Sequence, residues 1–338
     1  MPEQPSNTCI RFIKPVTAAV GKEHFALSVE PMPRAVPGHI VVRNVYLSLD
    51  PSQRRQMMPG VVYAEPLHVG DVMIGRTMGR VIESCRPDFQ VGDWVRGKLG
   101  WQDYALSDGA MLERIELGGF SPSAYLGVLG NPGITAWVGL NKVATAHAGE
   151  TVVVSAAAGA VGSVVAALAR DKGCRVVGIA GGASKCAHAV EHIGYDACVD
   201  YRDMSFRSKL ELATPQGVDV DFENVGGWVF DCVLERLNKY ARVALCGLVS
   251  QYNLAEPDGL RNISAILNNN ASIQGFRLAN YASHRPAAVA DLKRLLTAGA
   301  VRQDETIIDG LEQAPQAFID LFQGANLGKM LVRIGSDE

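Results

Sequence analysis

A buried strand, a glycine-rich turn and a helix are predicted in succession between residues 151 and 175, and this segment constrains the fold most strongly. It reads TVVVSAAAGAVGSVVAALARDKGCR, with a β-branched start typical of a buried strand and an alanine-rich continuation typical of a helix. Strand, glycine turn and helix in this order form the dinucleotide fingerprint, in which the helix N-terminus faces the phosphates. The segment therefore predicts a dinucleotide-binding site.

The turn matches the fingerprint G-x-G-x-x-G at its second and third glycine positions, whereas Ala157 replaces the first glycine. Gly159 is expected to let the backbone approach a pyrophosphate, and Gly162 to let the helix pack close to the strand. Together with Ala160 and Val161, these glycines form the predicted pyrophosphate site.

The same segment has two alternative interpretations. Residues 151–169 carry no charge, and their length is near the roughly 20 residues that span a bilayer. The glycine turn and the β-branched start favour a strand and a helix over a membrane span. A βα unit that binds no ligand is the second alternative, and the features below disfavour it.

The end of the second predicted strand indicates which dinucleotide binds. NAD sites usually place an acidic residue there to hold the ribose 2′-hydroxyl. Here residues 175–180 are followed by GGASK, and no acid occurs before Glu191. Small residues leave room for a 2′-phosphate, and Lys185 supplies a positive charge. We predict NADPH rather than NADH, although a solvated lysine at a helix start is the alternative for Lys185.

Composition excludes several classes of function. The 338 residues carry a net charge of −3 without a basic run, which gives no electrostatic case for nucleic acid or an anionic membrane. The seven cysteines and seven histidines are scattered without zinc-ligand spacing, so we expect free thiols and no metal. The first 12 residues lack an apolar signal core, and a cytoplasmic location is expected.

The character of the chain changes near residue 125. The part before it contains short β-rich runs broken by Gly, Pro and Asp, which predict a barrel-like all-β domain. Residues 123–144 look helical, interrupted at 131–133, and βα units follow to about residue 246. We predict an α/β protein with domain boundaries as follows: 1–125, completed by 301–338, for the β domain, and 126–300 for a doubly wound parallel sheet.

Longer motifs resemble the zinc-independent medium-chain dehydrogenase/reductase superfamily, and within it the prostaglandin, alkenal double-bond and curcumin reductases. The resemblance covers nearly the whole chain. The motifs are VRNVYLSLDP (42–51), WQDYALSDG (101–109), SAYLGVLGNPGITAW (123–137), FENVGG (222–227), CGLVSQYN (246–253) and GANLGKMLVRI (324–334).

This resemblance implies a GroES-like domain, a Rossmann domain and NADPH-dependent reduction of the carbon–carbon double bond of enones and enals. It implies a homodimer, often formed through edge strands of the nucleotide domain. It also implies that Lys185 and Tyr201 reach the 2′-phosphate. The remaining implied cofactor-binding residues are Asn224, Cys246, Gly247, Ser250, Tyr252, Phe276, Arg277, Leu278 and Asn326.

Hydride addition to an enone moves charge onto the carbonyl oxygen, which needs a hydrogen-bond donor. A phenol stays protonated near neutral pH and suits this role. Tyr252 is the first candidate, and the cofactor ribose 2′-hydroxyl could share the task. Tyr46, in the β domain, is the second candidate. The alternative for either tyrosine is a half-buried aromatic with a satisfied hydroxyl.

The chain departs from the usual pattern of the group at Ser52, Gln53, Asn131 and Trp137. If Ser52 and Gln53 line the pocket, a shorter or more polar acceptor than a long lipid enone is expected. Two other functions remain open: an NADPH-dependent quinone reductase of the same superfamily, and a non-catalytic NADPH-binding protein.

Overall fold

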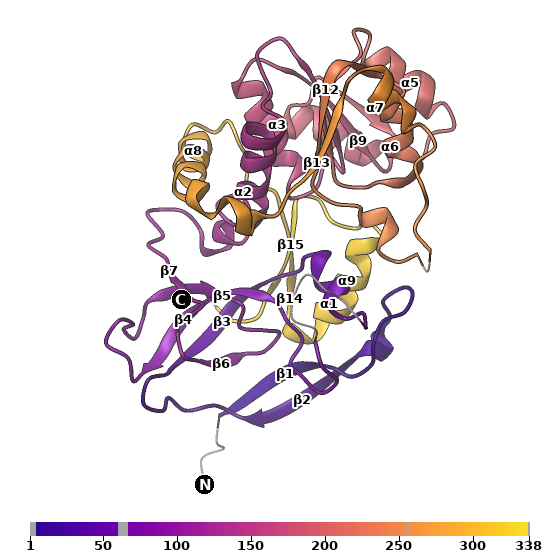
Figure 1. Cartoon of the computed structure of the whole chain (residues 1–338). Coiled ribbons are helices and arrows are strands. Elements are labelled where there is room, and N and C mark those ends of the chain that lie inside the picture. Colours follow the sequence, from indigo (N-terminus) through magenta and orange to yellow (C-terminus); the bar gives the residue numbers. More distant parts are fainter. Residues whose placement is uncertain (1–4, 60–66, 255, 337–338) are drawn as a thin grey trace. The chain divides into compact units, whose positions relative to one another are not determined.

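The computed structural model describes residues 5–59, 67–254 and 256–336. The chain forms two compact units, Met1–Leu126 with Glu305–Glu338, and Gly127–Asp304 (Figure 1). The first unit is mainly antiparallel and the second contains a parallel sheet with helices on both faces. These findings confirm the predicted fold class.

The first unit contains a two-stranded sheet, β1–β2, and a seven-stranded sheet in the order β14-β15-β3-β4-β5-β7, with β6 also paired to β3. Strand β15 runs antiparallel to β3 and parallel to β14. The strands are β1 (Ser6–Phe12), β2 (Phe25–Pro31), β3 (Ile40–Ser48), β4 (Arg76–Ser84), β5 (Trp94–Gly97), β6 (Tyr104–Ser107), β7 (Glu113–Arg114), β14 (Glu305–Asp309) and β15 (Lys329–Arg333). The helices are α1 (Ser52–Gln56) and α9 (Ala314–Phe322).

An aromatic cluster forms the core of this unit. The Trp101 ring stacks on Phe25 at 5.5 Å and meets the edge of Phe318 at 5.6 Å. Trp101 and Phe318 are fully buried. Because Phe318 lies on α9, the cluster joins the C-terminal segment to the N-terminal strands.

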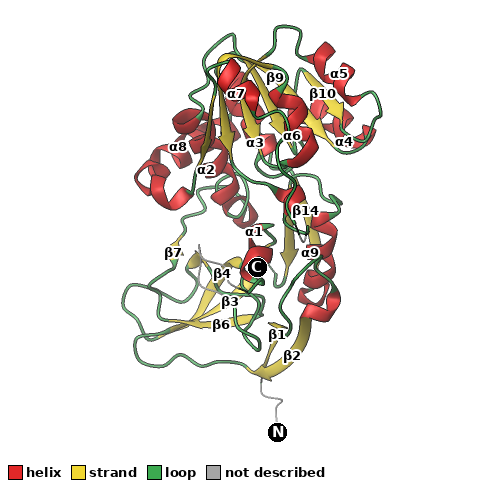
Figure 2. Cartoon of the chain, turned by 45° about the vertical axis from the view of Figure 1, so that its right-hand side comes forward, coloured by secondary structure: helices red, strands yellow, loops and turns green. Residues whose placement is uncertain are grey.

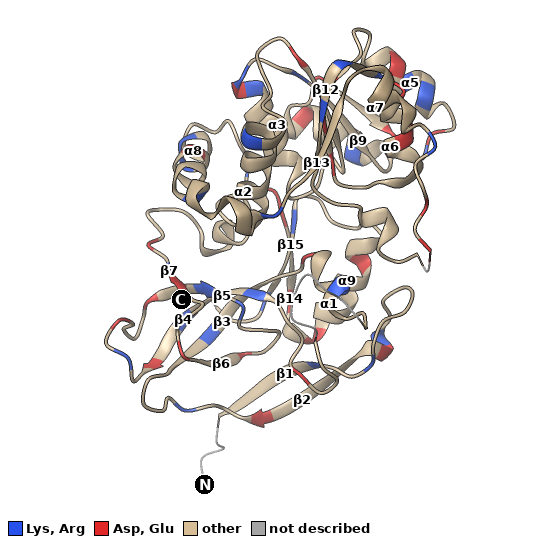
Figure 3. Ribbon diagram, viewed as in Figure 1, with Lys and Arg blue, Asp and Glu red and all other residues tan. Residues whose placement is uncertain are grey.

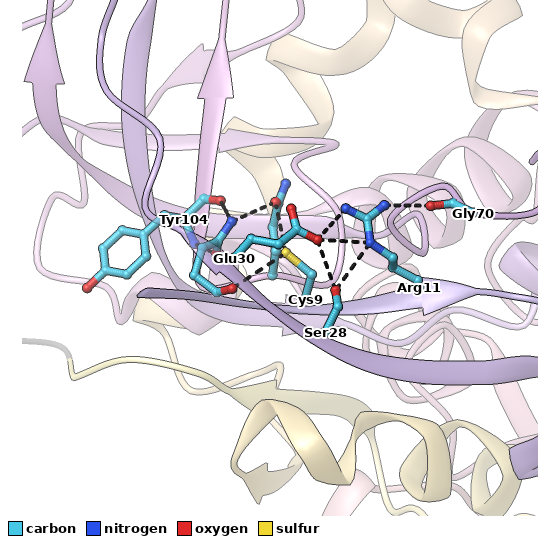
Figure 4. Close-up of polar contacts among 8 residues, drawn as sticks. Cys9, Arg11, Ser28, Glu30, Gly70 and Tyr104 are labelled. Carbon is cyan, nitrogen blue, oxygen red and sulfur yellow. Dashed lines mark hydrogen bonds and ion pairs between the residues drawn. The ribbon is translucent and has the colours of Figure 1, made fainter. Parts of the chain in front are cut away.

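A polar cluster holds the β1–β2 hairpin to a neighbouring loop (Figure 4). Arg11 forms an ion pair with Glu30, donates to Ser28 and donates to the Gly70 carbonyl oxygen. Burial raises the pKa of the nearby Cys9 thiol to about 11, so this thiol stays protonated at neutral pH. The cluster is structural, because its charged groups are satisfied by one another.

The SLDP and GKMLV motifs meet inside the first unit. The buried Lys329 ammonium donates to the Leu49 carbonyl oxygen at 2.6 Å and lies 3.1 Å from the Asp50 carboxylate. Ser48 donates to the same carboxylate at 2.8 Å. These motif residues therefore fix the end of β3 to the start of β15.

The parallel sheet of the second unit has the order β10-β9-β8-β11-β12-β13. Strands β8 to β10 are added in one direction across the sheet and strands β11 to β13 in the other, so the strand order reverses between β8 and β11. Ligands of such sheets bind at this point, beyond the carboxyl ends of the strands. The strands are β8 (Thr151–Ser155), β9 (Arg175–Ala180), β10 (Ala197–Asp200), β11 (Val218–Glu223), β12 (Leu237–Leu245) and β13 (Ser272–Gly275).

Helices cover both faces of this sheet, with α2, α3 and α8 on one side and α5, α6 and α7 on the other (Figures 1 and 2). Valines of the central strands and apolar residues of α5 and α6 form one core cluster. The helices are α2 (Asn131–Val138), α3 (Gly162–Asp171), α4 (Ala183–His188), α5 (Phe206–Ala213), α6 (Gly227–Leu234), α7 (Ser264–Asn268) and α8 (Arg285–Thr297).

The sequence Asn131-Pro132-Gly133 begins α2 and does not interrupt a helix, contrary to the sequence-based expectation. Proline suits the first turn of a helix, where its missing N–H has no intrahelical acceptor. A Cβ at Gly133 would lie 1.8 Å from the Val128 carbonyl oxygen. Glycine is therefore required for the close approach of this first turn to the preceding loop.

Charges of both signs are distributed over both units (Figure 3). Among the described residues, no helix combines the length and the apolar character needed to cross a membrane.

Candidate functional site

The turn between β8 and α3 offers unpaired backbone N–H groups. Within the described part of the chain, the N–H groups of Ala160, Val161 and Gly162 have no backbone acceptor, whereas Ser163 already donates to Gly159 at 3.0 Å. These N–H groups stand at the N-terminus of a ten-residue helix. Their dipoles and the helix dipole favour an anion at this point. The turn can therefore hold a pyrophosphate.

Close backbone contacts explain the residue types in this turn. A Cβ at Gly162 would lie 2.5 Å from the Ala156 carbonyl oxygen, so α3 packs closer to the turn than a side chain permits. The methyl group of Ala157, at the first glycine position, is accommodated by Gly178 on β9. A Cβ at Gly178 would lie 2.7 Å from that methyl group. The alanine in the fingerprint is thus matched by a glycine on the neighbouring strand.

Lys185 and Tyr201 both lie next to the end of β9, where an NAD-binding protein would place an acid. A Cβ at Gly181 would lie 2.8 Å from the Tyr201 hydroxyl oxygen, so Gly181 makes room for this phenol. Burial, together with the neighbouring Arg202, lowers the pKa of the Lys185 ammonium. Among the described residues, Lys185 has no carboxylate partner. Lys185 and Tyr201 therefore place a cation and a phenol where an anionic group of a ligand could bind.

Arg202 is a residue of this region that sequence reasoning missed. Its guanidinium carbon lies 5.9 Å from the centre of the Tyr201 ring, and the backbone N–H of Arg202 donates to the Asp200 carboxylate at 2.9 Å. The same carboxylate oxygen accepts from the N–H of Gly182 at 2.8 Å. Asp200 therefore holds together the turn before α4, the helix that carries Lys185, and the segment that carries Arg202. The signal in the sequence was the position of Arg202 directly after Tyr201, at the end of a predicted strand.

The loops after β8 and β11 are joined by hydrogen bonds at the switch point of the sheet. The Asn224 side chain donates to the Ser155 carbonyl oxygen at 2.8 Å, and the Asn224 N–H donates to the Ser155 hydroxyl at 2.7 Å. That hydroxyl donates to the buried Glu223 carboxylate at 2.9 Å, which also accepts from the N–H of Gly226 at 2.6 Å. Asn224 thus holds together the loops after β8 and β11, beside which the cofactor is predicted to bind.

Tyr252 folds back over the end of β12. Its hydroxyl oxygen accepts from the Leu248 N–H at 3.4 Å, and a Cβ at Gly247 would lie 3.5 Å from it. The Ser250 hydroxyl donates to the Val225 carbonyl oxygen at 2.6 Å. Burial raises the pKa of the Cys246 thiol to about 12, so this thiol is not a nucleophile at neutral pH. The phenol of Tyr252 is half-buried beside the loop that contains Asn224.

Phe276 points into the protein, whereas Arg277 is exposed. The Phe276 ring meets Phe222 and Tyr281 edge to face, each at 6.3 Å. The backbone of Arg277 is extended and leads into a short helical turn that begins at Leu278. The Phe276 ring is thus occupied by aromatic contacts, and its role at the cofactor stays a prediction.

Tyr46 and Asn326 belong to the first unit. Tyr46 is buried on β3, and the Arg333 side chain donates a hydrogen bond to it. The Asn326 amide donates to the Gly328 carbonyl oxygen at 2.7 Å. Their roles stay predictions, and the burial of Tyr46 favours Tyr252 as the phenol that meets a substrate.

Three residues that depart from the family pattern form hydrogen bonds within their own units. The Gln53 amide group donates to the Ser48 carbonyl oxygen at 3.1 Å and is buried. Asn131 accepts from Arg285 at 3.0 Å, and the Trp137 indole donates to Asp291 at 3.0 Å. Asn131 and Trp137 therefore attach α2 to α8, and Gln53 fixes the turn at the end of β3.

Asp221 is fully buried on β11, between Val153 of β8 and Val243 of β12. Within the described residues, neither of its carboxylate oxygens has a hydrogen-bond partner. Burial, followed by the nearby Glu223 carboxylate, raises the pKa of Asp221 well above its usual range. Burial of a polar group without a partner is unfavourable, so Asp221 lowers the stability of the unit.

We expect Asp221→Val to stabilise the protein by about 1–3 kcal/mol, measured by urea unfolding near neutral pH. The gain should grow as the pH rises above about 4, because the unfolded Asp221 then loses its proton while the folded one retains it. Glu223→Val is the matched control on the same strand, and it should destabilise because Glu223 accepts several hydrogen bonds. A destabilised Asp221→Val protein would contradict this account.

Comparisons with known proteins agree with this geometry. Residues 9–115 match the family described as the N-terminal domain of oxidoreductase, and residues 160–294 match the family described as zinc-binding dehydrogenase. Among the described residues, no group of three or more His, Cys, Asp or Glu side chains could hold a metal ion.

The chain is 44% identical to the NADPH-dependent curcumin reductase of Escherichia coli over 94% of this chain and 93% of that protein. It is 37% identical to the NADP(+)-dependent 2-alkenal reductase of Nicotiana tabacum over 88% of each chain. The crystal structure of CurA from Vibrio vulnificus in complex with NADPH shares 41% identity and a TM-score of 0.92, over 97% of this chain and 99% of that chain.

Proposed function

The chain belongs to the medium-chain dehydrogenase/reductase superfamily, in the group of the curcumin, prostaglandin and alkenal reductases, and from this premise we propose its reaction. It is an NADPH-dependent oxidoreductase that reduces the carbon–carbon double bond of α,β-unsaturated ketones and aldehydes. The observation that supports this proposal is the set of groups in the second unit that suit phosphates, since Lys185 lies there and the segment directly after β9 carries no acid for the ribose of NADH.

The residues of the second unit fit NADPH. The unpaired N–H groups of residues 160–162 suit the pyrophosphate. Lys185, Tyr201 and Arg202 suit the 2′-phosphate, because they offer two cations and a phenol where small residues leave space. In this proposal residues 126–300 are the cofactor domain, and residues 1–125 with 301–338 are the substrate domain.

The bound cofactor supplies a hydride, and the protein supplies the hydrogen bond that the reaction needs. As the β-carbon of the substrate gains the hydride, negative charge develops on the carbonyl oxygen. The Tyr252 hydroxyl donates to that oxygen and stabilises the charge. Its contact with Leu248 uses the phenol oxygen as an acceptor, so this contact orients the group. The α-carbon then takes up a proton.

An acceptor series tests the proposal. NADPH absorbance is followed with a simple α,β-unsaturated ketone, with a quinone and without acceptor, and NADH is used in parallel. We expect loss of NADPH only with the ketone, and a saturated ketone as the product. Consumption with the quinone alone would move the assignment to a quinone reductase, and binding without turnover would indicate a non-catalytic NADPH-binding protein.

We also propose that the protein is a homodimer that associates through the edge strand β13. Strand β13 ends the parallel sheet, and Ser272, Gln274 and Gly275 on it are exposed. On the adjacent α7 segment, Ile263 is 50% and Leu267 is 79% exposed. An unpaired edge beside exposed apolar side chains is a suitable surface for a second copy of the chain.

Gln274→Pro is expected to convert the dimer to a monomer, because proline removes a donor from the edge strand. Leu267→Asp should act in the same direction by placing a charge in the interface. Leu212→Asp is the matched control, since Leu212 is 78% exposed on α5 at the other end of the sheet. Sedimentation velocity measures the outcome, and unchanged dimers in both β13-side variants would reject this interface.

The free thiols are consistent with a reducing environment, and we propose a cytoplasmic location.

A further inference from the structure

Glu223, the last residue of β11, is fully buried at the carboxyl end of the parallel sheet. One oxygen of its carboxylate, Oε1, accepts three hydrogen bonds: from the Ser155 hydroxyl at 2.9 Å, from the Gly226 N–H at 2.6 Å and from the Val225 N–H. Among the described residues, its second oxygen, Oε2, has no partner. A single oxygen of Glu223 therefore joins the end of β8 to the loop after β11.

The loop after β11 in turn supports the loop after β12. The Asn224 carbonyl oxygen accepts from the Val249 N–H at 3.1 Å. The Val225 carbonyl oxygen accepts from the Ser250 N–H at 3.0 Å and from the Ser250 hydroxyl at 2.6 Å. Residues 249–251 form one short helical turn. The first two residues after β11 therefore fix this turn through their carbonyl oxygens.

Tyr252 follows this turn directly, and its N–H donates to the Val249 carbonyl oxygen at 3.3 Å. A Cβ at Gly247 would lie 3.2 Å from the Asn224 carbonyl oxygen and 3.5 Å from the Tyr252 hydroxyl oxygen. Both oxygens therefore lie beside Gly247, the phenol on one loop and the carbonyl on the other. The position of the phenol is consequently tied to the loop that Glu223 holds.

We propose that Glu223 is a positioning residue of the reaction, which places the Tyr252 hydroxyl for the substrate through the loops after β11 and β12. Because Glu223 is fully buried, it acts through these loops and not by contact with the substrate. A donor stabilises a developing charge best when it is held within about 0.5 Å of the productive geometry. This role rests on the proposed function, in which Tyr252 donates to the carbonyl oxygen of the enone.

A purely structural role of Glu223 is the competing explanation, and Asp219 on the same strand provides the control for it. Asp219 accepts from the Thr151 N–H at 2.8 Å and from the Asn238 side chain at 2.7 Å. Its hydrogen bonds therefore join the amino ends of β8 and β12, whereas Tyr252 follows the carboxyl end of β12. Loss of the Asp219 carboxylate should lower stability without reaching the phenol.

The test compares variants of the full-length chain with an enone and NADPH, at a temperature where circular dichroism shows each variant folded. Glu223→Leu removes all three hydrogen bonds, and we expect kcat to fall about 10- to 100-fold while the NADPH dissociation constant changes by about threefold or less. Glu223→Gln keeps an acceptor oxygen, and its kcat should stay within about threefold of the unaltered chain. Asp219→Leu should lower the midpoint of urea unfolding and leave kcat unchanged.

A double-mutant cycle separates positioning from general damage to the protein. If Glu223 acts through the Tyr252 hydroxyl, Glu223→Leu should lower kcat by about twofold or less in a Tyr252→Phe protein, which lacks that hydroxyl. Ser155→Ala removes one of the three hydrogen bonds and gives the same comparison if Glu223→Leu does not fold, with an expected loss of about threefold in kcat in the chain that retains Tyr252.

Equal losses of kcat in the two backgrounds would overturn the proposal, as would full turnover in Glu223→Leu. Normal turnover in Tyr252→Phe would remove Tyr252 from the reaction, and the role of Glu223 with it. An unaltered chain that reduces no enone would contradict the proposed function itself. Normal enone reduction together with additive losses in the cycle would contradict the role of Glu223 alone.

Discussion

Replacing Lys185 by glutamate is expected to weaken NADPH binding by about 100-fold and to change NADH binding by about twofold or less. The half-buried ammonium lies beside Arg202 and has no carboxylate partner within the described part of the chain, and the 2′-phosphate is the anion that suits it. A hydrogen bond to a charged group contributes about 1.5–3 kcal/mol, and the introduced carboxylate adds repulsion. NADH lacks this phosphate, so its affinity reports on the rest of the site.

Lys239→Glu is the matched control for this charge reversal. Lys239 is exposed near the start of β12, whereas the predicted cofactor site lies at the carboxyl ends of the strands. The control protein should bind both cofactors as the unaltered chain does. Equal losses of NADPH and NADH affinity in the Lys185 variant would mean that the substitution disturbs the fold and not the phosphate site. Unchanged NADPH affinity would reject the assignment of Lys185.

Tyr252→Phe is expected to lower kcat by about 10²- to 10³-fold while the NADPH dissociation constant stays unchanged. The substitution removes only the hydroxyl, which is the proposed donor to the carbonyl oxygen of the substrate. An interaction made as charge develops affects kcat and kcat/KM together, whereas a binding interaction changes KM alone. Steady-state kinetics with an enone and an NADPH titration separate these two outcomes.

Tyr240→Phe is a control for the loss of a phenol, because Tyr240 is 69% exposed and lies on the early part of β12. Tyr46→Phe tests the second candidate, whose side chain is buried and hydrogen-bonded to Arg333. We expect full turnover in the Tyr240 variant and a smaller loss in the Tyr46 variant than in the Tyr252 variant. A Tyr252→Phe enzyme with normal turnover would remove Tyr252 from the reaction.

The sequence predicted the parallel sheet and the glycine turn between its first strand and helix because both depend on local patterns. A β-branched run, a glycine turn and an alanine-rich helix specify β8 and α3 without distant information. The absence of an acidic residue directly after β9 can likewise be read from the sequence alone. Gly178, by contrast, makes room for Ala157 and Cys198 from a neighbouring strand, and only the strand register shows this.

Other features depend on tertiary packing and were not predictable. Residues 218–223 alternate polar and apolar side chains, as in a strand with one face in water. The structure buries Asp221 and Glu223 because helices cover both faces of this central strand. Strand β12 begins at Leu237 and contains Tyr240, whose φ of 65° no local pattern indicates. Arg202 lies beside Lys185 only after β9 and β10 pair.

The central claim is that a hydride passes from NADPH to the β-carbon of an enone. The most direct measurement uses NADPH deuterated at carbon 4 of the nicotinamide, with an α,β-unsaturated ketone in ordinary water, and locates the deuterium in the product by NMR. Both C4-deuterated epimers are used separately. The account predicts a saturated ketone with deuterium at the β-carbon from one epimer. Deuterium on a carbinol carbon, or a product without deuterium from either epimer, would contradict it.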